Sequence, residues 1–312
     1  MPLDPRARRF LDRLAASNPQ NALALTAEAR RAALAELLQG LSGTAPAVLR
    51  VEERSIPGPA APLPLRIYTP AGAAGDVLPG LVYFHGGGFV AGSLDTHDTI
   101  ARSLANSCGA RLLSVGYRLG PEHRFPAAIE DGCAAARWVA AHARELGLDP
   151  TRLVLCGDSA GGTLAAVVCQ VTTAERSAHW ALQLLLCPIL DFCASTPSRS
   201  ELATGYFLDQ ATLDHDLRYY LAPGVDPRDP RVSPLRTREL HDLPPSCVHT
   251  AEFDPLRDEG LEYARRLEAA GVRTLYRCHS GMIHLFYGMG ALIPYAATAY
   301  RLIGADVRGM LG

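Results

Sequence analysis

The sequence predicts an α/β protein built on a mostly parallel β-sheet that is flanked by helices. Short apolar segments alternate with segments of helical periodicity through most of the chain. The apolar segments are uniformly hydrophobic, which is typical of strands buried on both faces of a parallel sheet. The chain has 312 residues, of which 48% are hydrophobic, so it can fill a sizeable core.

The first 45 residues predict two short helices outside the sheet, because their apolar positions recur at helical spacing. From residue 48 the pattern changes to strands separated by Gly and Pro. The expected strands of this part are Val48–Ile56, Leu65–Tyr68, Leu81–Phe84 and Leu112–Tyr117.

Strands and helices alternate in the rest of the chain. The further expected strands are Arg152–Cys156, Ala181–Cys187, Ser246–Ala251 and Arg273–Cys278. The expected helices are Ala127–Leu146, the segment after Ser159, Leu256–Ala270 and roughly Leu285–Ile303.

One segment interrupts this alternation: about 50 residues rich in Pro, Asp, Arg and Tyr replace a short connection. We interpret residues 191–243 as a helical cap insertion which, with the N-terminal cap helices of residues 1–45, covers one end of the sheet. The catalytic core would then comprise residues 46–190 and 244–312.

The charged residues exclude several mechanisms. The 30 basic residues face 32 acidic ones, and all the basic residues are arginine because the chain contains no lysine. Schiff-base chemistry, pyridoxal phosphate enzymes and the Walker A phosphate loop each need a lysine amine. A net charge of −2 gives no basic surface for nucleic acid or an anionic membrane, so we expect a small-molecule partner.

No membrane span, secretion signal or metal motif is expected. The uncharged stretch from Val77 to Leu94 contains Pro79, His85 and several glycines, which is unlike a membrane helix. The N-terminus carries alternating charge without the apolar core of a signal peptide, so we expect a cytoplasmic protein. Its eight cysteines form no C-x-x-C pair and predict reduced, buried thiols.

The sharpest local signal is Gly157-Asp158-Ser159-Ala160-Gly161, which follows an expected strand and opens an expected helix. In that context G-x-S-x-G indicates a nucleophilic serine on a tight turn, with glycines where side chains would collide with neighbouring backbone. The structural alternative is a serine helix cap beside packing glycines.

A second signal is His85-Gly86-Gly87-Gly88-Phe89 at the end of an expected strand. Backbone N–H groups stabilise the oxyanion of acyl transfer when no Cβ blocks their approach, and consecutive glycines provide that access. The spacing does not fit the dinucleotide pattern G-x-G-x-x-G. A glycine-rich turn that merely punctuates the sheet is the structural alternative.

A nucleophilic serine needs a base, and the base needs an orienting acid. Asp254 lies just past an expected strand, with Glu252, Asp258 and Glu259 as rivals for the acid. The base candidates are His279 and His284, and position alone does not choose between them. His284 is expected after a flexible Ser280-Gly281 turn, at the start of the terminal helix.

From about Leu65 to the C-terminus the chain resembles the bacterial hormone-sensitive lipase-like family of α/β-hydrolases, a group of carboxylesterases. Six motifs occur in the family's order: His85–Gly88, Gly92–His97, Tyr117–Glu122, Gly157–Gly162, Asp254–Glu259 and Gly281–His284. The resemblance implies that Ser159 is the nucleophile, Asp254 the orienting acid and His284 the base.

The resemblance also implies an oxyanion hole made by the N–H groups of Gly87, Gly88 and Ala160, with Gly86 shaping the turn. It places Arg118 and Glu122 in buried ionic contacts. Leu285 departs from the family, which commonly has glycine there. The candidate substrate-binding residues are His85, Asp158, Tyr206, Phe207, Leu208, Leu213 and Leu285.

The expected function is therefore a serine carboxylesterase that hydrolyses short- to medium-chain esters without metal or organic cofactor. The family resemblance implies dimers as a frequent assembly. An amidase, a lactonase or a deacetylase would use the same triad. A non-catalytic receptor on this scaffold is the alternative of another class, although the plant hormone receptors of this kind lack the histidine that this chain has.

Overall fold

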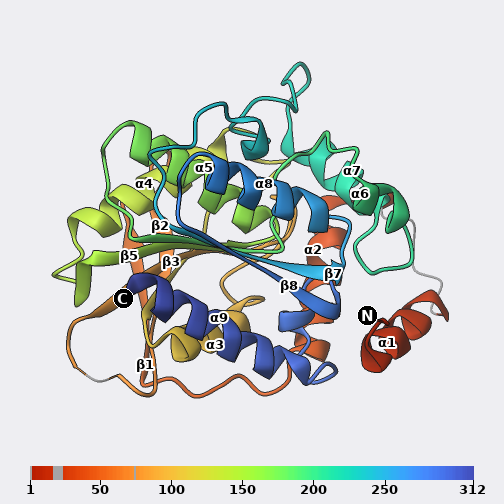
Figure 1. Cartoon of the computed structure of the whole chain (residues 1–312), viewed down its shortest axis with the longest axis horizontal. Helices are drawn as coiled ribbons and strands as arrows, with labels where there is room; N and C mark the ends of the chain where they lie inside the picture. Colours follow the sequence, from red (N-terminus) through yellow and green to blue (C-terminus); the bar gives the residue numbers. More distant parts are fainter. Residues whose placement is uncertain (1, 17–23, 74) are drawn as a thin grey trace.

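The computed structural model of the protein describes residues 2–16, 24–73 and 75–312. An eight-stranded sheet of order β1-β2-β4-β3-β5-β6-β7-β8 forms its centre (Figure 1). The strands are β1 (Arg50–Ile56), β2 (Leu63–Thr69), β3 (Leu78–Phe84), β4 (Arg111–Val115), β5 (Leu148–Asp158), β6 (Leu182–Leu186), β7 (Ser246–Phe253) and β8 (Thr274–Ile283).

Helices connect most of these strands. They are α1 (Pro5–Ala16), α2 (Ala27–Leu41), α3 (Asp98–Cys108), α4 (Ala127–Ala141), α5 (Ala160–Ala174), α6 (Pro197–Glu201), α7 (Gln210–Tyr220), α8 (Arg257–Ala269) and α9 (Tyr295–Leu311), with short 3₁₀ turns η2 (Pro234–Arg236) and η3 (Phe286–Gly288). Strands β1, β2 and β4 pair antiparallel, and all other pairs are parallel. The predicted α/β class with a mostly parallel sheet is confirmed.

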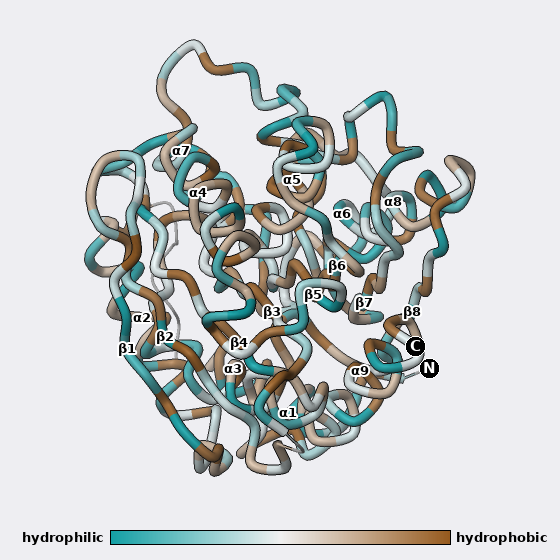
Figure 2. Tube along the Cα trace, turned by 90° about the vertical axis from the view of Figure 1, so that its left-hand side faces the viewer, coloured by the Kyte–Doolittle hydropathy of each residue, from teal (hydrophilic) through white to brown (hydrophobic). Residues whose placement is uncertain are grey.

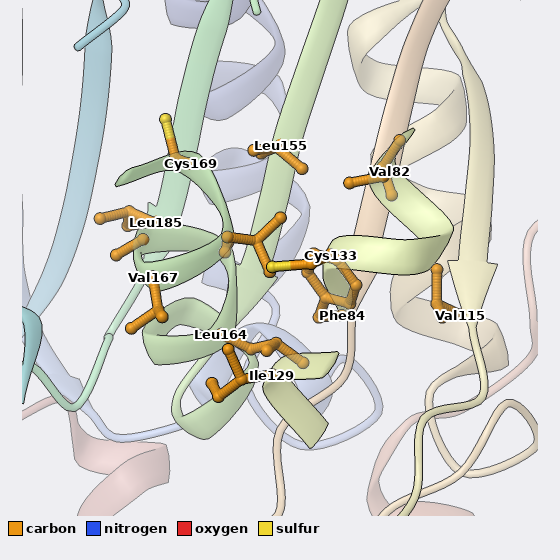
Figure 3. Close-up of a cluster of buried hydrophobic side chains, with 14 of the residues drawn as sticks. Val82, Phe84, Val115, Ile129, Cys133, Leu155, Leu164, Val167, Cys169 and Leu185 are labelled. Atoms are coloured by element: carbon orange, nitrogen blue, oxygen red, sulfur yellow. The ribbon is translucent and has the colours of Figure 1, made fainter. Parts of the chain in front are cut away.

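Successive side chains of a strand point to opposite sides of the sheet, and helices bury both sides of its inner strands. In β3, Val82 and Phe84 join a cluster with residues of α4 and α5, whereas Leu81 and Tyr83 join a second cluster with residues of α3 and α9. Figure 3 shows part of the first cluster, with Phe84 among side chains that include Ile129 and Leu164. Helices α4, α5 and α8 cover one face of the sheet in Figure 1, and α3 and α9 the other.

Strand β1 forms one edge of the sheet and is largely exposed. Its sequence is mostly charged or polar, and Figure 2 shows hydrophilic colour along it. Charged side chains on an edge strand disfavour pairing with another chain.

The C-terminal part differs from the prediction in two ways. Strand β8 continues to Ile283, so the expected Ser280-Gly281 turn is wrong: Gly281 lies within the strand and its N–H donates to Glu252 Oε2 at 2.7 Å. The terminal helix begins at Tyr295 rather than at Leu285. Leu285 has a φ of 60°, which interrupts a right-handed helix, and the helix starts only after Pro294.

Helix α3 was missing from the sequence prediction. Its first residue follows His97, whose side chain makes no capping hydrogen bond, so the usual start signal is absent. Its end carries a signal that the prediction overlooked, since Gly109 has a φ of 63° at the C-terminal cap.

Helices α1, α2, α6 and α7 gather at one end of the sheet in Figure 1, the end where β7 and β8 finish. Thr26 caps α2 by accepting from the N–H of Ala29, and Asp209 caps α7 by accepting from the N–H of Thr212. Among the described helices, none has both the length and the apolar content needed to cross a bilayer.

Candidate active site

Ser159 occupies the turn between β5 and α5, and its φ of 54° lies in a region that non-glycine residues rarely adopt. The residues two positions before and after it must be glycine. A Cβ at Gly157 would overlap the backbone of Gly161, and a Cβ at Gly161 would overlap the carbonyl oxygen of Phe84. The turn places Ser159 in the wall of a cavity, where 7% of the surface of Ser159 is exposed.

Ser159, His284 and Asp254 form a continuous hydrogen-bonded series. His284 Nε2 lies 3.1 Å from Ser159 Oγ, and His284 Nδ1 lies 2.7 Å from Asp254 Oδ2. Asp254 is fully buried, and its Oδ1 accepts from the N–H of Leu256 at 2.9 Å. Because a carboxylate only accepts, His284 Nδ1 carries a proton toward Asp254, which leaves Nε2 free to accept from the serine hydroxyl.

The rival acids have other partners. Glu252 accepts from Gly281 N–H, Asp258 accepts from Ser198 N–H at 2.8 Å, and Glu259 pairs with Arg199 at 2.8 Å. The rival base also lies elsewhere, since His279 Nε2 is 3.1 Å from His249 Nδ1. Among the acids and bases that the sequence left open, the structure thus places Asp254 and His284 in contact with each other and His284 in contact with Ser159.

The glycine-rich loop after β3 lies against the same turn. Gly87 and Gly88 have φ values of 123° and 66°, and the carbonyl of Gly87 accepts from Ala91 N–H at 2.8 Å, which closes the loop. Gly86 N–H donates to Asp158 Oδ1 at 3.0 Å. Ala160 is the first residue of α5, so its N–H has no acceptor within the helix. These N–H groups lie on the two segments that meet beside Ser159.

Asp158, which precedes Ser159 in the turn, connects that turn to the glycine-rich loop through a hydrogen bond from Gly86. The hydroxyl of Tyr83 and the N–H of Gly86 donate to its Oδ1, and His97 Nε2 lies 3.6 Å from its Oδ2. Burial alone would raise the pKa of Asp158, but His97 and the hydrogen bond from Tyr83 outweigh burial and lower it. A buried carboxylate therefore fixes the position of Gly86.

A cavity of about 280 Å³ opens above Ser159 and His284. Its walls come from the glycine-rich loop, the serine turn, α2 and α7. The remaining lining residues are Leu14, Leu25, Arg30, Ala33, Leu34, Leu37, Gly86, Gly87, Gly88, His97, Asp158, Ile189, Phe207, Leu208, Thr212, Leu213, Asp216 and Leu285.

A family model of the alpha/beta hydrolase fold matches residues 81–288, which span the glycine-rich loop, the serine turn, Asp254 and His284. The chain belongs to the hormone-sensitive lipase-like family of α/β-hydrolases.

Proteins similar to this α/β-hydrolase align with it over most of their length. Esterase LipI from Mycobacterium tuberculosis is 42% identical over 254 residues, which cover 80% of this chain and 79% of LipI. Ethyl acetate hydrolase from Pseudomonas putida is 40% identical over 242 residues, covering 75% and 74% of the two chains. The solved structure of ester-hydrolase EH1AB1, from the metagenome of Lake Arreo, matches with a TM-score of 0.95 and 38% identity over 98% of both chains.

Most residues predicted to bind substrate line the cavity of this α/β-hydrolase, and two do not. Asp158, Phe207, Leu208, Leu213 and Leu285 are in its wall. His85 stacks on Tyr117 with ring centroids 4.4 Å apart, and its carbonyl accepts from the Tyr117 hydroxyl at 2.6 Å. Burial, with the neighbouring His97, lowers the pKa of His85 to about 3, so it is neutral at pH 7. Tyr206 stacks on Phe253 instead.

Sequence reasoning missed several residues of the wall. Leu34 and Leu37 are among the apolar positions that predict a helix in the first 45 residues, and helical spacing alone does not tell what that helix faces. Arg30 and Asp216 resemble ordinary surface charges in the sequence. Nothing local distinguishes them, because they meet only when α2 and α7 fold together.

One set of side chains in the described part of this hydrolase resembles a metal-ligand group: Cys187, Asp254 and His284 offer ligand atoms within 4.8 Å of one another. The carboxylate and the imidazole already bind each other at 2.7 Å. Burial raises the pKa of Cys187 well above its usual range, whereas a metal ligand must be the thiolate. The set fits a hydrogen-bonded acid and base better than a metal centre.

Proposed function

We propose that the protein is a serine carboxylesterase in which Ser159 is the nucleophile, His284 the general base and Asp254 the orienting acid. The observation that carries the proposal is the series from Ser159 Oγ through both ring nitrogens of His284 to Asp254, with distances of 3.1 Å and 2.7 Å. The esterase and ester hydrolase names of its relatives support an ester as the substrate.

Acylation begins when Ser159 Oγ attacks the ester carbonyl and His284 Nε2 takes the serine proton. The carbonyl oxygen becomes an oxyanion, which accepts hydrogen bonds from the N–H groups of Gly87, Gly88 and Ala160. The positive end of α5 adds to this stabilisation. When the intermediate collapses, the C–O bond breaks and the alcohol leaves with the proton from His284.

Deacylation repeats these steps with water. His284 Nε2 removes a proton from a water molecule as the water oxygen attacks the acyl-Ser159 ester. The second intermediate collapses, the proton returns to Ser159 Oγ, and the carboxylic acid leaves. Asp254 stays ionised and holds the imidazole in the tautomer that both halves need.

The cavity supports small esters as substrates. Its volume of about 280 Å³ is just below the range of about 300–1,000 Å³ that is usual for ligand pockets. Most of its wall surface is apolar, which favours an uncharged acyl chain. We therefore propose short- to medium-chain carboxylic esters.

Hydrolysis of p-nitrophenyl esters from C2 to C16 tests the proposal. Ser159→Ala should abolish turnover while the circular dichroism spectrum and melting temperature stay near those of the parent. Ser200→Ala, an exposed serine on α6, is the matched control and should keep full activity. Full activity of Ser159→Ala would refute the nucleophile assignment.

The same assay separates the alternatives. A p-nitroanilide that is cleaved faster than the matching p-nitrophenyl ester would indicate an amidase. Tight ligand binding without any turnover by the parent would indicate a receptor.

We further propose that the enzyme acts in the cytoplasm as a homodimer. Support for the compartment comes from the eight cysteines, which are all free thiols. Support for the dimer is the family resemblance alone. Thiol titration of protein purified without reductant should give eight thiols after unfolding, and light scattering should give twice the chain mass of 33.4 kDa.

A further inference from the structure

An ion pair lies in the mostly apolar wall of the cavity. Arg30 belongs to α2 and Asp216 to α7, so the pair joins the N-terminal segment to the insertion. Arg30 Nη2 lies 3.1 Å from Asp216 Oδ2, and Arg30 Nε lies 3.3 Å from Asp216 Oδ1. Their side chains are 15% and 5% exposed, and both line the cavity that contains Ser159.

The carboxylate of Asp216 lies directly against the glycine-rich loop. A Cβ at Gly88 would overlap Asp216 Oδ2, so residue 88 must lack a side chain for this contact as well as for its φ of 66°. Gly88 is one of the proposed donors to the oxyanion. A negative charge at this place opposes the charge that develops on the substrate oxygen, and a partly buried site screens that repulsion poorly.

The charge of Asp216 is balanced from the cap. Arg30 contacts both carboxylate oxygens, and its Nη2 contacts Oδ2, the oxygen nearest Gly88. His215 Nδ1 lies 2.9 Å from the other oxygen, and His215 Nε2 lies 3.0 Å from the carbonyl oxygen of Leu25. Arg30 is thus the permanently charged group that faces the side of Asp216 next to the oxyanion hole.

We infer that Arg30 is a positioning residue for ester hydrolysis, because its guanidinium cancels the charge of Asp216 beside the oxyanion hole and holds that carboxylate in place. The inference rests on the proposed function, since it assumes that Gly88 donates to the oxyanion. Full rate then requires that α2 and α7 are packed together. The cap contributes to the chemical step as well as to the shape of the pocket.

A double-mutant cycle tests this inference on p-nitrophenyl butyrate. Arg30→Met leaves the carboxylate uncompensated and should lower kcat by about 10- to 100-fold with a smaller change in KM. Asp216→Asn removes the harmful charge and should lower kcat by less than about threefold. Arg30→Met/Asp216→Asn should recover most of the activity that Arg30→Met loses, because neither charge remains.

Recovery of activity in the double variant distinguishes a role of Arg30 in neutralising Asp216 from a role in holding the two helices together. If the ion pair only held the cap together, each single variant would be slow and the double variant no faster than Arg30→Met, and that result would overturn the inference. Equal activity of Arg30→Met and parent would also overturn it. Arg30→Gln keeps hydrogen-bond donors without the charge, and it replaces Arg30→Met in the cycle should the methionine variant fail to fold.

Two controls accompany the cycle. Arg137→Met removes an arginine from an exposed pair with Glu175 on the outer surface and should leave kcat unchanged. Ser159→Ala identifies failure of the underlying function: if it remains active, the serine assignment and this inference both fall. If Ser159→Ala is inactive and the double variant is not rescued, only the inference falls.

Discussion

Arg199→Met is expected to destabilise the protein far more at alkaline than at acid pH. Arg199 of α6 and Glu259 of α8 form an ion pair in which the two side chains are 6% and 0% exposed, with Nη2 and Oε1 2.8 Å apart. Glu259 Oε2 accepts from the N–H groups of Leu190 and Asp191 at 2.7 Å and 2.6 Å. The pair therefore ties α6 and the segment that follows β6 to α8.

The magnitude follows from burial. Removing the cation leaves an ionised carboxylate buried with only two backbone donors, and breaking a buried pair in this way costs about 3–5 kcal/mol. Once the carboxyl group is protonated, the variant loses only the hydrogen bonds of Arg199, which are worth about 1–2 kcal/mol. The protonation state of Glu259 thus sets the size of the effect.

The pH window follows from the pKa of Glu259. Burial raises this pKa from 4.5 to about 7, although Arg199 and the two backbone N–H groups act in the opposite direction. A folded-state pKa above the unfolded one means that stability falls as pH rises from 4.5 through about 7. Without Arg199 the folded-state pKa is higher still, so the stability of the variant continues to fall above pH 7.

Urea unfolding followed by circular dichroism at pH 6 and pH 9 measures this difference. The free energy of unfolding of Arg199→Met should be lower than that of the parent by about 1–2 kcal/mol at pH 6 and by about 3–5 kcal/mol at pH 9. Arg137→Met, from the exposed pair with Glu175, should change stability by less than about 1 kcal/mol at both pH values. An equal loss at the two pH values for Arg199→Met would refute the reasoning.

Three further predictions concern the site and its surroundings. Asp254→Asn should lower kcat by about 10⁴-fold in ester hydrolysis with little change in melting temperature, because the amide favours the wrong tautomer of His284; a loss below tenfold would contradict that role. Burial, with Arg277, lowers the pKa of His279 to about 4, so stability held above pH 6.5 should fall by about 3 kcal/mol as pH drops through 4; urea midpoints of His279→Gln should show a shallower acid decline, and an unchanged slope would exclude this group. Leu213→Trp should fill the cavity and suppress p-nitrophenyl octanoate hydrolysis while acetate hydrolysis persists; parallel loss of both would show that Leu213 does not limit chain length.

The parts of the site that the sequence predicts are those encoded by local sterics. Ser159 needs glycines two residues away on either side, and the glycine-rich loop needs residues without Cβ. Both requirements can therefore be recognised in the sequence without knowledge of the tertiary structure. The acid and base leave a weaker pattern. Glu252, Asp254, Asp258 and Glu259 all lie within eight residues of one another, and only the fold decides which of them faces His284.

The parts that could not be predicted depend on contacts between distant segments. Arg30 and Asp216 are separated by 186 positions, and each has the surroundings of an ordinary helical surface charge in the sequence. The sequence pattern places the start of α9 too early for a different reason. Residues 285–293 are mostly apolar, but Leu285 has a positive φ, Phe286–Gly288 form a 3₁₀ turn, and the helix begins only after Pro294.

The absence of lysine has a structural consequence beyond the chemistry that it excludes. Two fully buried carboxylates of this protein pair with a guanidinium. Arg118 donates from Nε and Nη2 to the two oxygens of Asp131 at 2.8 Å each, whereas Nε and Nη2 of Arg199 both contact Oε1 of Glu259, at 3.0 Å and 2.8 Å. An ammonium group cannot hold two atoms of a carboxylate in one plane. The expected burial of Glu122 is wrong, since it is 47% exposed in its pair with Arg31. At Arg30 the same fork spans both oxygens of Asp216, so an Arg30→Lys variant would keep the charge and lose the geometry that sets the carboxylate against Gly88.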